Sequence, residues 1–298
     1  MKKTAYLILA HNDPTHLAKL TKTLGKENDI YVHLDAKTDP KEYIEKCPPS
    51  TNFIKDRVNV AWAGISMVDA LLNLIKAALE LSEHYTHLIF ISGSDYPIKS
   101  IEEINNTFTS NPQREFIKFI DMRDSPEHYL KQVTRKQYLE PLLRTQNKLL
   151  KLLDKSTRKV LRGLKIRNKW QANITPYYGH TWCALTPKCC EYILNFHNTN
   201  NWFYEMNKNT FAADEHYFHT IIGNSPFASR ADGLQTHEGS GLWRLTNFHL
   251  ICPSLTKWFT LNDWEQIEKS EKLFVRKVST SKSSSLLDKI DHHLYKQT

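Results

Sequence analysis

The stretch Thr86–Ser100, THLIFISGSDYPIKS, limits the possible folds of this 298-residue chain more than any other part of it. Its residues His87–Ile91 form a short apolar run without a polar face, rich in β-branched and aromatic side chains and followed by Gly93 and Pro97. Such a run predicts a strand that is buried on both sides, as in the parallel sheets of α/β proteins.

Small and acidic residues, Ser92–Asp95, end this apolar run. Because ligands of open α/β sheets bind beyond the carboxyl ends of the strands, Ser94 and Asp95 lie where a site is expected. The alternative is a turn in which Asp95 only accepts hydrogen bonds from neighbouring backbone groups. Ser100 and Glu103 then form a capping-box pattern that predicts the start of a helix.

Strand and helix patterns alternate along the chain, which predicts one α/β domain over 1–298 with a mostly parallel central sheet. The other expected strands are Ala5–Ala10, Ile30–Leu34, Asn52–Ile54, Val58–Val60, Glu115–Ile120, Thr181–Leu185 and an extended Leu273–Val278. The expected helices are Pro14–Leu24, Met67–Leu81, Ile101–Thr109, Pro187–His197, Ala213–Ile222, Leu261–Glu268 and Ser285–Leu294, with a loop at Ser279–Ser285. Asp35 follows the strand Ile30–Leu34, so Asp35 and Asp95 are expected at the same edge of the sheet.

One segment supplies the positive net charge of the chain, which is +8 in total. Between Lys131 and Trp170 there are 13 Lys and Arg residues against Glu140 and Asp154, so this segment carries +11 and the remainder −3. Leucines recur within it at helical spacing, which predicts a basic helical insertion over 126–170 with one or two amphipathic helices. Such helices can lie on an anionic membrane, bind nucleic acid or simply be solvated.

Several common motifs are missing from the sequence. It has no phosphate loop, no dinucleotide-binding fingerprint, no nucleophile elbow, and no D-x-D pair of the kind that holds a divalent metal in many nucleotide-sugar transferases. Its five cysteines lack C-x-x-C spacing, which indicates neither a disulfide framework nor a zinc site and favours a reducing, cytoplasmic compartment. We expect neither a transmembrane helix nor a signal peptide, because the N-terminal apolar segment is short and matches a strand.

The densest polar cluster of the chain is Asp214–His219. Carboxylates in the first turn of a helix are favoured by the helix dipole, but Asp214 or Glu215 could also act as a general base. His216 and His219 could ligate a metal, although a third ligand at matching spacing is missing.

Isolated cations and tryptophans form a second group of candidates. Arg276 and Lys277 stand in an extended segment, and Lys257 lies beside Trp258; each is either a solvated charge or a ligand-contacting cation. Trp62 and Trp182 are either core or edge aromatics or rings that stack on a nucleotide base.

Seven blocks carry a resemblance to a known family: AYLILAHNDP, IYVHLDAKTD, VAWAGISMVDALLNLIKAAL, YTHLIFISGSDYPIKSIEEI, GHTWCALTPKCCEYIL, FAADEHYFHTII and SEKLFVRKV. In this order they resemble the core-2/I-branching β-1,6-N-acetylglucosaminyltransferase family, glycosyltransferase family 14, which includes the peptide xylosyltransferases. The resemblance spans about residues 4–278, and SGSDYPIKS and LFVRKV are its most specific blocks.

This resemblance implies a GT-A-like fold and an inverting transfer from a UDP-sugar, with no metal and no other cofactor. It places the catalytic base on Glu215 and a cation that contacts the donor diphosphate on Lys277. It also implies nucleotide contacts near His11, Asp35 and Trp62, and acceptor contacts near Trp182 and Asp214. With Asp95 from the strand end, the expected substrate-binding residues are His11, Asp35, Trp62, Asp95, Trp182, Asp214, Arg244, Lys257, Arg276 and Lys277.

The expected activity is metal-independent transfer of a sugar, N-acetylglucosamine in the first place, to a glycan or lipid-linked oligosaccharide with β-linkage. Animal members of the family have an N-terminal membrane anchor and paired cysteines. This sequence has neither, which predicts a bacterial, cytoplasmic relative that makes surface polysaccharide at the inner face of the cytoplasmic membrane. Two alternatives stay open: a nucleic-acid-binding protein that uses residues 131–169, and an inactive sugar-binding GT-A scaffold.

Overall fold

The structure is a computed structural model that describes residues 3–81, 84–139, 142, 147–168, 170–171, 173–239 and 241–295. A large central sheet has the strand order β3-β2-β1-β4-β8-β6-β7, and β9 pairs with β6. Strands β3, β2, β1 and β4 run parallel, whereas β8 is antiparallel to both β4 and β6. The bounds are β1 (Lys3–Ala10), β2 (Asp29–Leu34), β3 (Thr51–Phe53), β4 (Tyr85–Ser92), β6 (Glu115–Asp121), β7 (Tyr177–Tyr178), β8 (Ala184–Leu185) and β9 (Ala231–Leu234).

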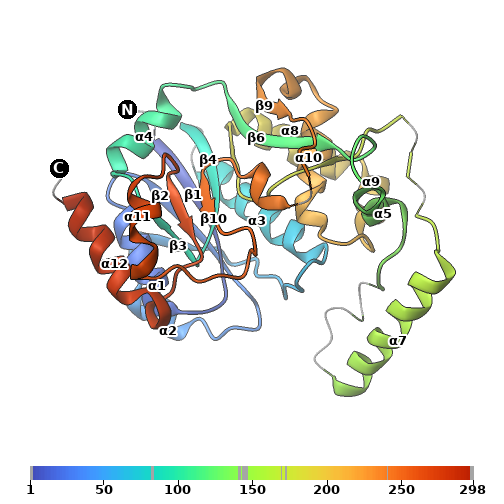
Figure 1. Ribbon diagram of the computed structural model, residues 1–298, viewed down its shortest axis with the longest axis horizontal. Coiled ribbons are helices and arrows are strands. Elements are labelled where there is room, and N and C mark those ends of the chain that lie inside the picture. The colour runs from blue at the N-terminus through green and yellow to red at the C-terminus, as the bar shows by residue number, and fades with distance from the viewer. Residues whose placement is uncertain are drawn as a thin grey trace.

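Helices cover both faces of this sheet, and a second sheet with the order β10-β11-β5 lies beside it (Figure 1). The small sheet consists of β5 (Asp95–Pro97), β10 (His249–Ile251) and β11 (Phe274–Arg276). The helices are α1 (Pro14–Leu24), α2 (Lys41–Lys46), α3 (Ser66–Leu81), α4 (Ile101–Thr109), α5 (Glu127–Thr134), α7 (Lys148–Leu164), α8 (Pro187–Thr199), α9 (Asn201–Asn207), α10 (Tyr217–Gly223), α11 (Trp264–Glu268) and α12 (Thr280–Tyr295). Short 3-10 turns are η1 (Ala213–Glu215), η2 (Pro226–Arg230), η3 (Leu242–Leu245) and η4 (Leu261–Asp263). Among the described residues, no helix has both the length and the hydropathy needed to cross a bilayer.

The organising strand β4 is buried along its whole length, as its sequence predicts. Its side chains alternate between two cores because successive residues of a strand point to opposite faces. Phe90 belongs to the core formed with α3 and α8. Ile89 and Ile91 belong to the core formed with α1, α4 and α12. The prediction of an α/β fold with a mostly parallel, doubly covered sheet is therefore confirmed.

Two helix starts follow the expected capping chemistry. The Asp13 carboxylate accepts a hydrogen bond from the His16 backbone N–H at 3.0 Å, ahead of a proline at the first helical position of α1. The Ser100 hydroxyl accepts one from the Glu103 N–H at 3.1 Å. Both side chains satisfy backbone donors that lack a partner inside the helix.

Two sequence predictions of secondary structure are wrong. Val58–Val60 is a loop and forms no backbone ladder with β2. Its Val58 N–H donates to the His33 side chain at Nε2, 2.8 Å away, and its Val58 O accepts from Ala36 N–H at 3.0 Å. The serine-rich Ser279–Ser285 begins α12 instead of forming a loop. The Asp13 carboxylate caps it by accepting from Thr280 N–H at 2.7 Å, so the cap comes from a residue far away in sequence.

The basic segment contains the helices α5 and α7, in agreement with the predicted amphipathic helices. Positions 140–141, 143–146 and 169 of this segment lie outside the described residues. The described helix α7 has leucines and lysines at helical spacing, as the sequence predicts.

Candidate active site

The carboxyl ends of β1, β2 and β4 meet at one edge of the sheet. Asp35 N–H donates to Ala10 O at 2.9 Å, and Gly93 N–H donates to Leu9 O at 2.8 Å. Gly93 permits this approach, because a Cβ at its position would lie 3.2 Å from the Ala10 Cβ. His11, Asp35 and the turn after β4 are therefore brought together, as the topology of an open α/β sheet predicts.

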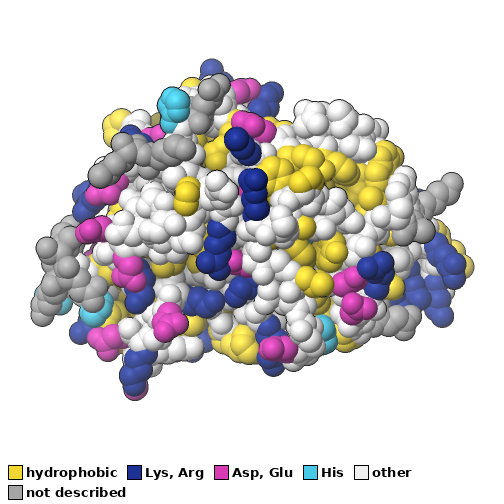
Figure 2. Space-filling model, turned by 90° about the horizontal axis from the view of Figure 1, so that it is seen from above, with side chains coloured by type: hydrophobic (Ala, Val, Ile, Leu, Met, Phe, Trp, Pro, Cys, Tyr) yellow, Lys and Arg dark blue, Asp and Glu magenta, His cyan; other side chains and the backbone are white. Residues whose placement is uncertain are grey.

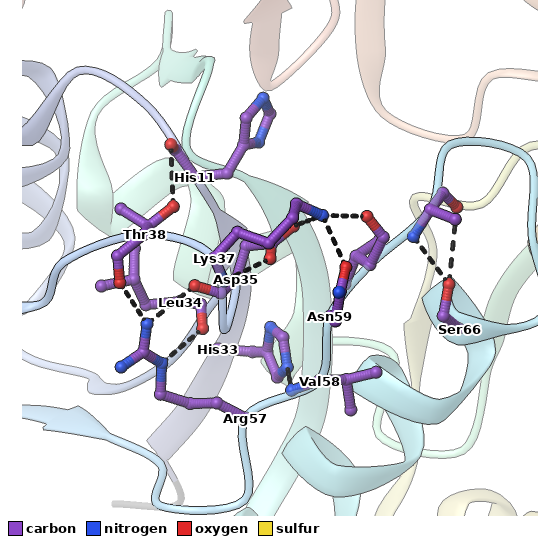
Figure 3. Close-up of polar contacts among 12 residues, drawn as sticks. His11, His33, Leu34, Asp35, Lys37, Thr38, Arg57, Val58, Asn59 and Ser66 are labelled. Atoms are coloured by element: carbon purple, nitrogen blue, oxygen red, sulfur yellow. Dashed lines mark hydrogen bonds and ion pairs between the residues drawn. The ribbon is translucent and has the colours of Figure 1, made fainter. Parts of the chain in front are cut away.

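Charged and polar side chains gather beyond β2 (Figure 3). Asp35 Oδ2 lies 2.9 Å from Lys37 Nζ, which also donates to Asn59 Oδ1 at 3.0 Å. Arg57 binds the backbone oxygens of Leu34 and Asp35 at 2.9 Å and 2.7 Å. Asp35 thus lies at the expected sheet edge, with its carboxylate already paired to a lysine that the sequence analysis did not select.

His11 connects this group to the end of β11. It is exposed, and its backbone oxygen accepts a hydrogen bond from Thr38 at 3.3 Å. Desolvation lowers the pKa of His11, and the charges of Asp35, Lys37, Arg276 and Lys277 also act on it. His11 and Asp35, two of the predicted nucleotide-contacting residues, therefore lie near Lys277, the predicted diphosphate-contacting cation, and near Arg276.

Arg276 is held in place by a buried carboxylate. Its Nη1 donates to Asp95 Oδ1 at 2.7 Å and also contacts the Ser92 hydroxyl, while its guanidinium lies 4.9 Å above the Trp182 ring. The other carboxylate oxygen, Asp95 Oδ2, accepts from Ser92 N–H at 2.7 Å and lies 3.1 Å from His249 Nε2. Burial alone would raise the pKa of Asp95, but Arg276 and His249 hold it well below its usual range.

Asp95 and Trp182 share one neighbour, Arg276. Both are buried, and both contact Arg276. Asp95 begins strand β5 and lies opposite Arg276 of β11 in the antiparallel pair, so it holds this cation in place. Asp95 thus accepts from a neighbouring backbone group, as the turn alternative predicts, and in addition binds Arg276 and His249.

Glu215 occupies the last position of the short turn η1, and it is partly exposed. Its Oε2 accepts a hydrogen bond from the Tyr178 hydroxyl at 2.7 Å. Burial and the neighbouring Asp214 raise the pKa of Glu215 to about 8, and the Tyr178 hydrogen bond opposes this rise. Asp214 is buried, accepts from the Thr181 hydroxyl at 2.7 Å and has a pKa that burial raises.

The expected helix Ala213–Ile222 is interrupted after Glu215, at His216. His216 Nε2 lies 3.1 Å from the Thr210 hydroxyl, and His219 Nε2 lies 3.2 Å from His180 O. Burial lowers the pKa of both rings to about 3. These contacts place the two histidines in the core, and no group of three or more His, Cys, Asp or Glu residues in the described part of the chain is arranged to hold a metal ion.

Trp62 is a largely exposed ring next to the turn that carries Glu215. Its side chain is 80% exposed and packs edge-on against Phe211, with the ring centroids 5.7 Å apart. Ala63 O accepts from Ala212 N–H at 2.9 Å, which joins the two loops. An exposed indole in this position has room to stack on a planar ligand.

The three remaining predicted cations differ in their burial and in the side chains that they contact. Lys277 is partly buried, and desolvation and the neighbouring Arg276 lower its pKa. Arg244 is exposed and stacks on Trp243, with 4.5 Å between its Cζ and the ring centroid. Lys257 forms an ion pair with Asp263 and lies over the Phe259 ring, and the Phe259 N–H donates to Lys277 O at 2.8 Å.

Tyr178, like Lys37, is a residue that sequence reasoning missed. Its hydroxyl donates to the Glu215 carboxylate, and its ring packs against Tyr129 with 4.6 Å between the ring centroids. The next residue, Gly179, lets the backbone pass close to β6 and α10, because a Cβ there would lie 2.3 Å from Lys118 O and 2.5 Å from the His219 ring. The glycine that follows Tyr177 and Tyr178 in the sequence indicates a close approach of the chain at this point, but it does not identify Glu215 as the partner of Tyr178.

Comparison with known proteins agrees with this arrangement. The model of the Core-2/I-Branching enzyme family matches residues 4–270. The chain belongs to the Core-2/I-Branching enzyme family. The match includes the sheet edge and the Glu215 turn, and it ends before Arg276 and Lys277.

Individual Core-2/I-Branching relatives are distant in sequence. The chain is 22% identical to "Xylosyltransferase oxt" of Drosophila melanogaster, over 93% of this chain and 32% of that protein. It is 23% identical to "Probable beta-1,3-galactosyl-O-glycosyl-glycoprotein beta-1,6-N-acetylglucosaminyltransferase 7" of Homo sapiens, over 73% of this chain and 48% of that protein. It is 24% identical to "N-acetyllactosaminide beta-1,6-N-acetylglucosaminyl-transferase" of Mus musculus, over 73% of this chain and 52% of that protein. The chain thus spans about a third to a half of the length of these curated relatives.

Proposed function

We propose that this protein is an inverting glycosyltransferase that moves a sugar from a UDP-sugar to a glycan hydroxyl with β-linkage. We further propose N-acetylglucosamine as the first sugar to test, metal-independent chemistry, and a role in bacterial surface polysaccharide synthesis. The names of the relatives, which include both xylosyl- and N-acetylglucosaminyltransferases, support sugar transfer in general.

One observation carries the proposal: the segment Tyr178–Trp182 contacts a carboxylate at one end and a cation at the other. Tyr178 binds Glu215, and Trp182 lies under Arg276. The Cα atoms of these ends can be at most about 13 Å apart, because a chain extends by about 3.3 Å per residue. The base and the cation are therefore held by the two ends of one five-residue segment, an arrangement that suits a substrate with a reacting sugar and a diphosphate.

The proposed reaction assigns one step to each group. Glu215 takes the proton of the acceptor hydroxyl as its oxygen attacks the anomeric carbon of the donor sugar. The bond from that carbon to the diphosphate oxygen breaks on the opposite side, which inverts the α-linked donor to a β-linked product. The departing UDP gains negative charge, and Arg276 and Lys277 stabilise it.

Metal independence is supported by the occupied carboxylate at the end of β4. A divalent cation needs several oxygen ligands that converge on it. Both oxygens of Asp95 already bind protein partners, with Arg276 on one and His249 on the other. The arginine supplies positive charge in the place where a metal-dependent enzyme would hold its ion.

The test is transfer from a panel of UDP-sugars, measured with and without excess EDTA. We expect UDP release and β-linked product with at least one donor, and the same rate in EDTA. Glu215→Gln is expected to lower the rate by about 10²-fold or more with UDP binding retained, since a general base contributes about that much. Glu102→Gln is the matched control, because Glu102 is exposed on α4. Full activity of Glu215→Gln would contradict the assignment.

A further inference from the structure

Helix α7 stands apart from the sheet and its covering helices at one end of the molecule (Figure 1). Of its described side chains only Asp154 and Leu161 are buried. Seventeen residues of helix with so little packing need another source of stabilisation, because isolated helices of this length are marginal in water.

One face of α7 attaches it to the body. Leu161 is buried, and Asp154 Oδ2 pairs with Arg158 Nη2 at 2.7 Å. The Arg158 guanidinium lies 5.7 Å from the centre of the Tyr138 ring, and the Tyr138 hydroxyl donates to Ala63 O at 2.9 Å. The helix is therefore joined to the loop that carries Trp62.

A second face of α7 is apolar and open to solvent. The exposed fractions are 78% for Leu149, 48% for Leu153, 54% for Val160 and 68% for Leu164. At 100° per residue these four positions fall within about 60° of one another, so they form one stripe. Several exposed apolar side chains on one side of a helix mark an interaction site, whereas single exposed leucines do not.

The third face of α7 is cationic. Lys148, Lys151, Lys155 and Lys159 are all exposed. The acidic residue of the helix, Asp154, points to the body and is neutralised by Arg158. Figure 2 shows basic side chains gathered at the end of the molecule that carries α7 in Figure 1. The surface that α7 presents outward therefore combines leucine and lysine without an exposed carboxylate.

We infer that α7 binds an anionic lipid bilayer, with its leucine stripe in the headgroup region and its lysines on the lipid phosphates. A bilayer satisfies both faces at once, because its interior takes the apolar stripe and its surface charge attracts the cations. Nucleic acid would leave the leucines in water, and a second copy of α7 would bring two rows of lysines together. The Tyr138–Ala63 contact makes this membrane-bound helix a neighbour of the Trp62 loop.

The test is co-sedimentation of the full chain with vesicles of phosphatidylcholine alone and of phosphatidylcholine with phosphatidylglycerol. We expect binding only to the anionic vesicles. Lys151→Glu/Lys155→Glu is expected to weaken it at least about 30-fold, since each cation near such a surface contributes about fivefold. The control Lys41→Glu/Lys188→Glu has the same change in charge at exposed positions of other helices, and should bind as the parent chain does.

A second pair of variants tests the apolar stripe. Leu149→Asn/Leu153→Asn should lose vesicle binding, whereas Leu81→Asn/Leu261→Asn, which alters exposed leucines elsewhere, should retain it. Circular dichroism and thermal melting verify that each variant is folded. Equal binding to both vesicle types, no binding to either, or equal effects of both leucine pairs would overturn the inference. Binding to DNA or RNA without vesicle binding, or a dimer that the Leu149/Leu153 variant abolishes, would also overturn it.

Discussion

The hydrogen bond from Tyr178 to Glu215 predicts a measurable pH dependence of the proposed transfer. Burial and Asp214 raise the pKa of Glu215 to about 8. A base acts in its ionised form, so kcat/KM should increase with pH and level off above this pKa. With a pKa of about 8, roughly a tenth of the carboxyl is ionised at pH 7 and about nine-tenths at pH 9. We therefore expect about a tenfold increase in rate between these two values.

Tyr178→Phe removes the one hydrogen bond that lowers this pKa. A hydrogen bond to a charged group contributes about 1.5–3 kcal/mol. Because one pKa unit corresponds to about 1.4 kcal/mol, the variant should move the ascending limb upward by about 1–2 pH units. At neutral pH it should then be about 10- to 100-fold slower, whereas much of the loss should be recovered in alkaline buffer.

The assay is the initial rate of UDP release at low substrate concentration, measured across pH 6 to about 10 in buffers of constant ionic strength, because kcat/KM reports the pKa of the free enzyme. Tyr192→Phe is the matched control, since Tyr192 lies on α8 and packs against Phe196 and Phe227. If kcat/KM rises over the same pH range in Tyr178→Phe as in the parent chain, the reasoning is refuted. A loss of rate that is equal at every pH would also refute it and would point to a structural role for Tyr178.

Three further predictions concern the charged groups. Arg276→Ala and Lys277→Ala should each lower transfer in EDTA, because both cations are proposed to meet the leaving diphosphate; an effect of Arg276→Ala alone would remove Lys277 from the mechanism. Asp95→Asn should lower the free energy of unfolding by about 3–5 kcal/mol in urea titrations, as breaking a buried ion pair does, whereas Asp263→Asn at the partly exposed Lys257 pair should cost about 1 kcal/mol or less. Because the pKa of Glu215 is raised in the folded protein, the folded parent chain binds a proton that the unfolded chain has lost, and its free energy of unfolding falls as pH rises from about 4.5 to 8. Glu215→Gln has no such proton, so in thermal melts it should become increasingly more stable than the parent chain over this range.

The sequence predicts those parts of the fold that depend on local patterns. The buried run of β4 has no polar face, and the Asp13 and Ser100 caps are defined by residues within three positions. Glu215 could be selected because the carboxylate lies in a block that resembles a known family. The sheet edge that gathers His11 and Asp35 follows from the topology of parallel strands.

The sequence could not predict the partners that are distant along the chain. Arg276 meets Asp95 181 positions away, and Tyr178 meets Glu215 37 positions away. Helical and strand periodicity says which face of an element a side chain occupies, but not which side chain it meets there. The same limit explains the serine-rich start of α12, because its cap is the remote Asp13.

Two acidic residues near this site have opposite environments, and this contrast supports the division of roles. Asp95 contacts Arg276 and His249, and its pKa is lowered, so it stays ionised and holds the cation in place. Glu215 has Asp214 beside it and a single hydroxyl donor, and its pKa is raised to about 8. Carboxyls whose environments shift their pKa values in opposite directions serve different purposes in catalysis. Only a carboxyl whose pKa lies close to neutral pH can exchange a proton with the acceptor during each turnover, which assigns the proposed proton transfer to Glu215 and leaves Asp95 to position Arg276.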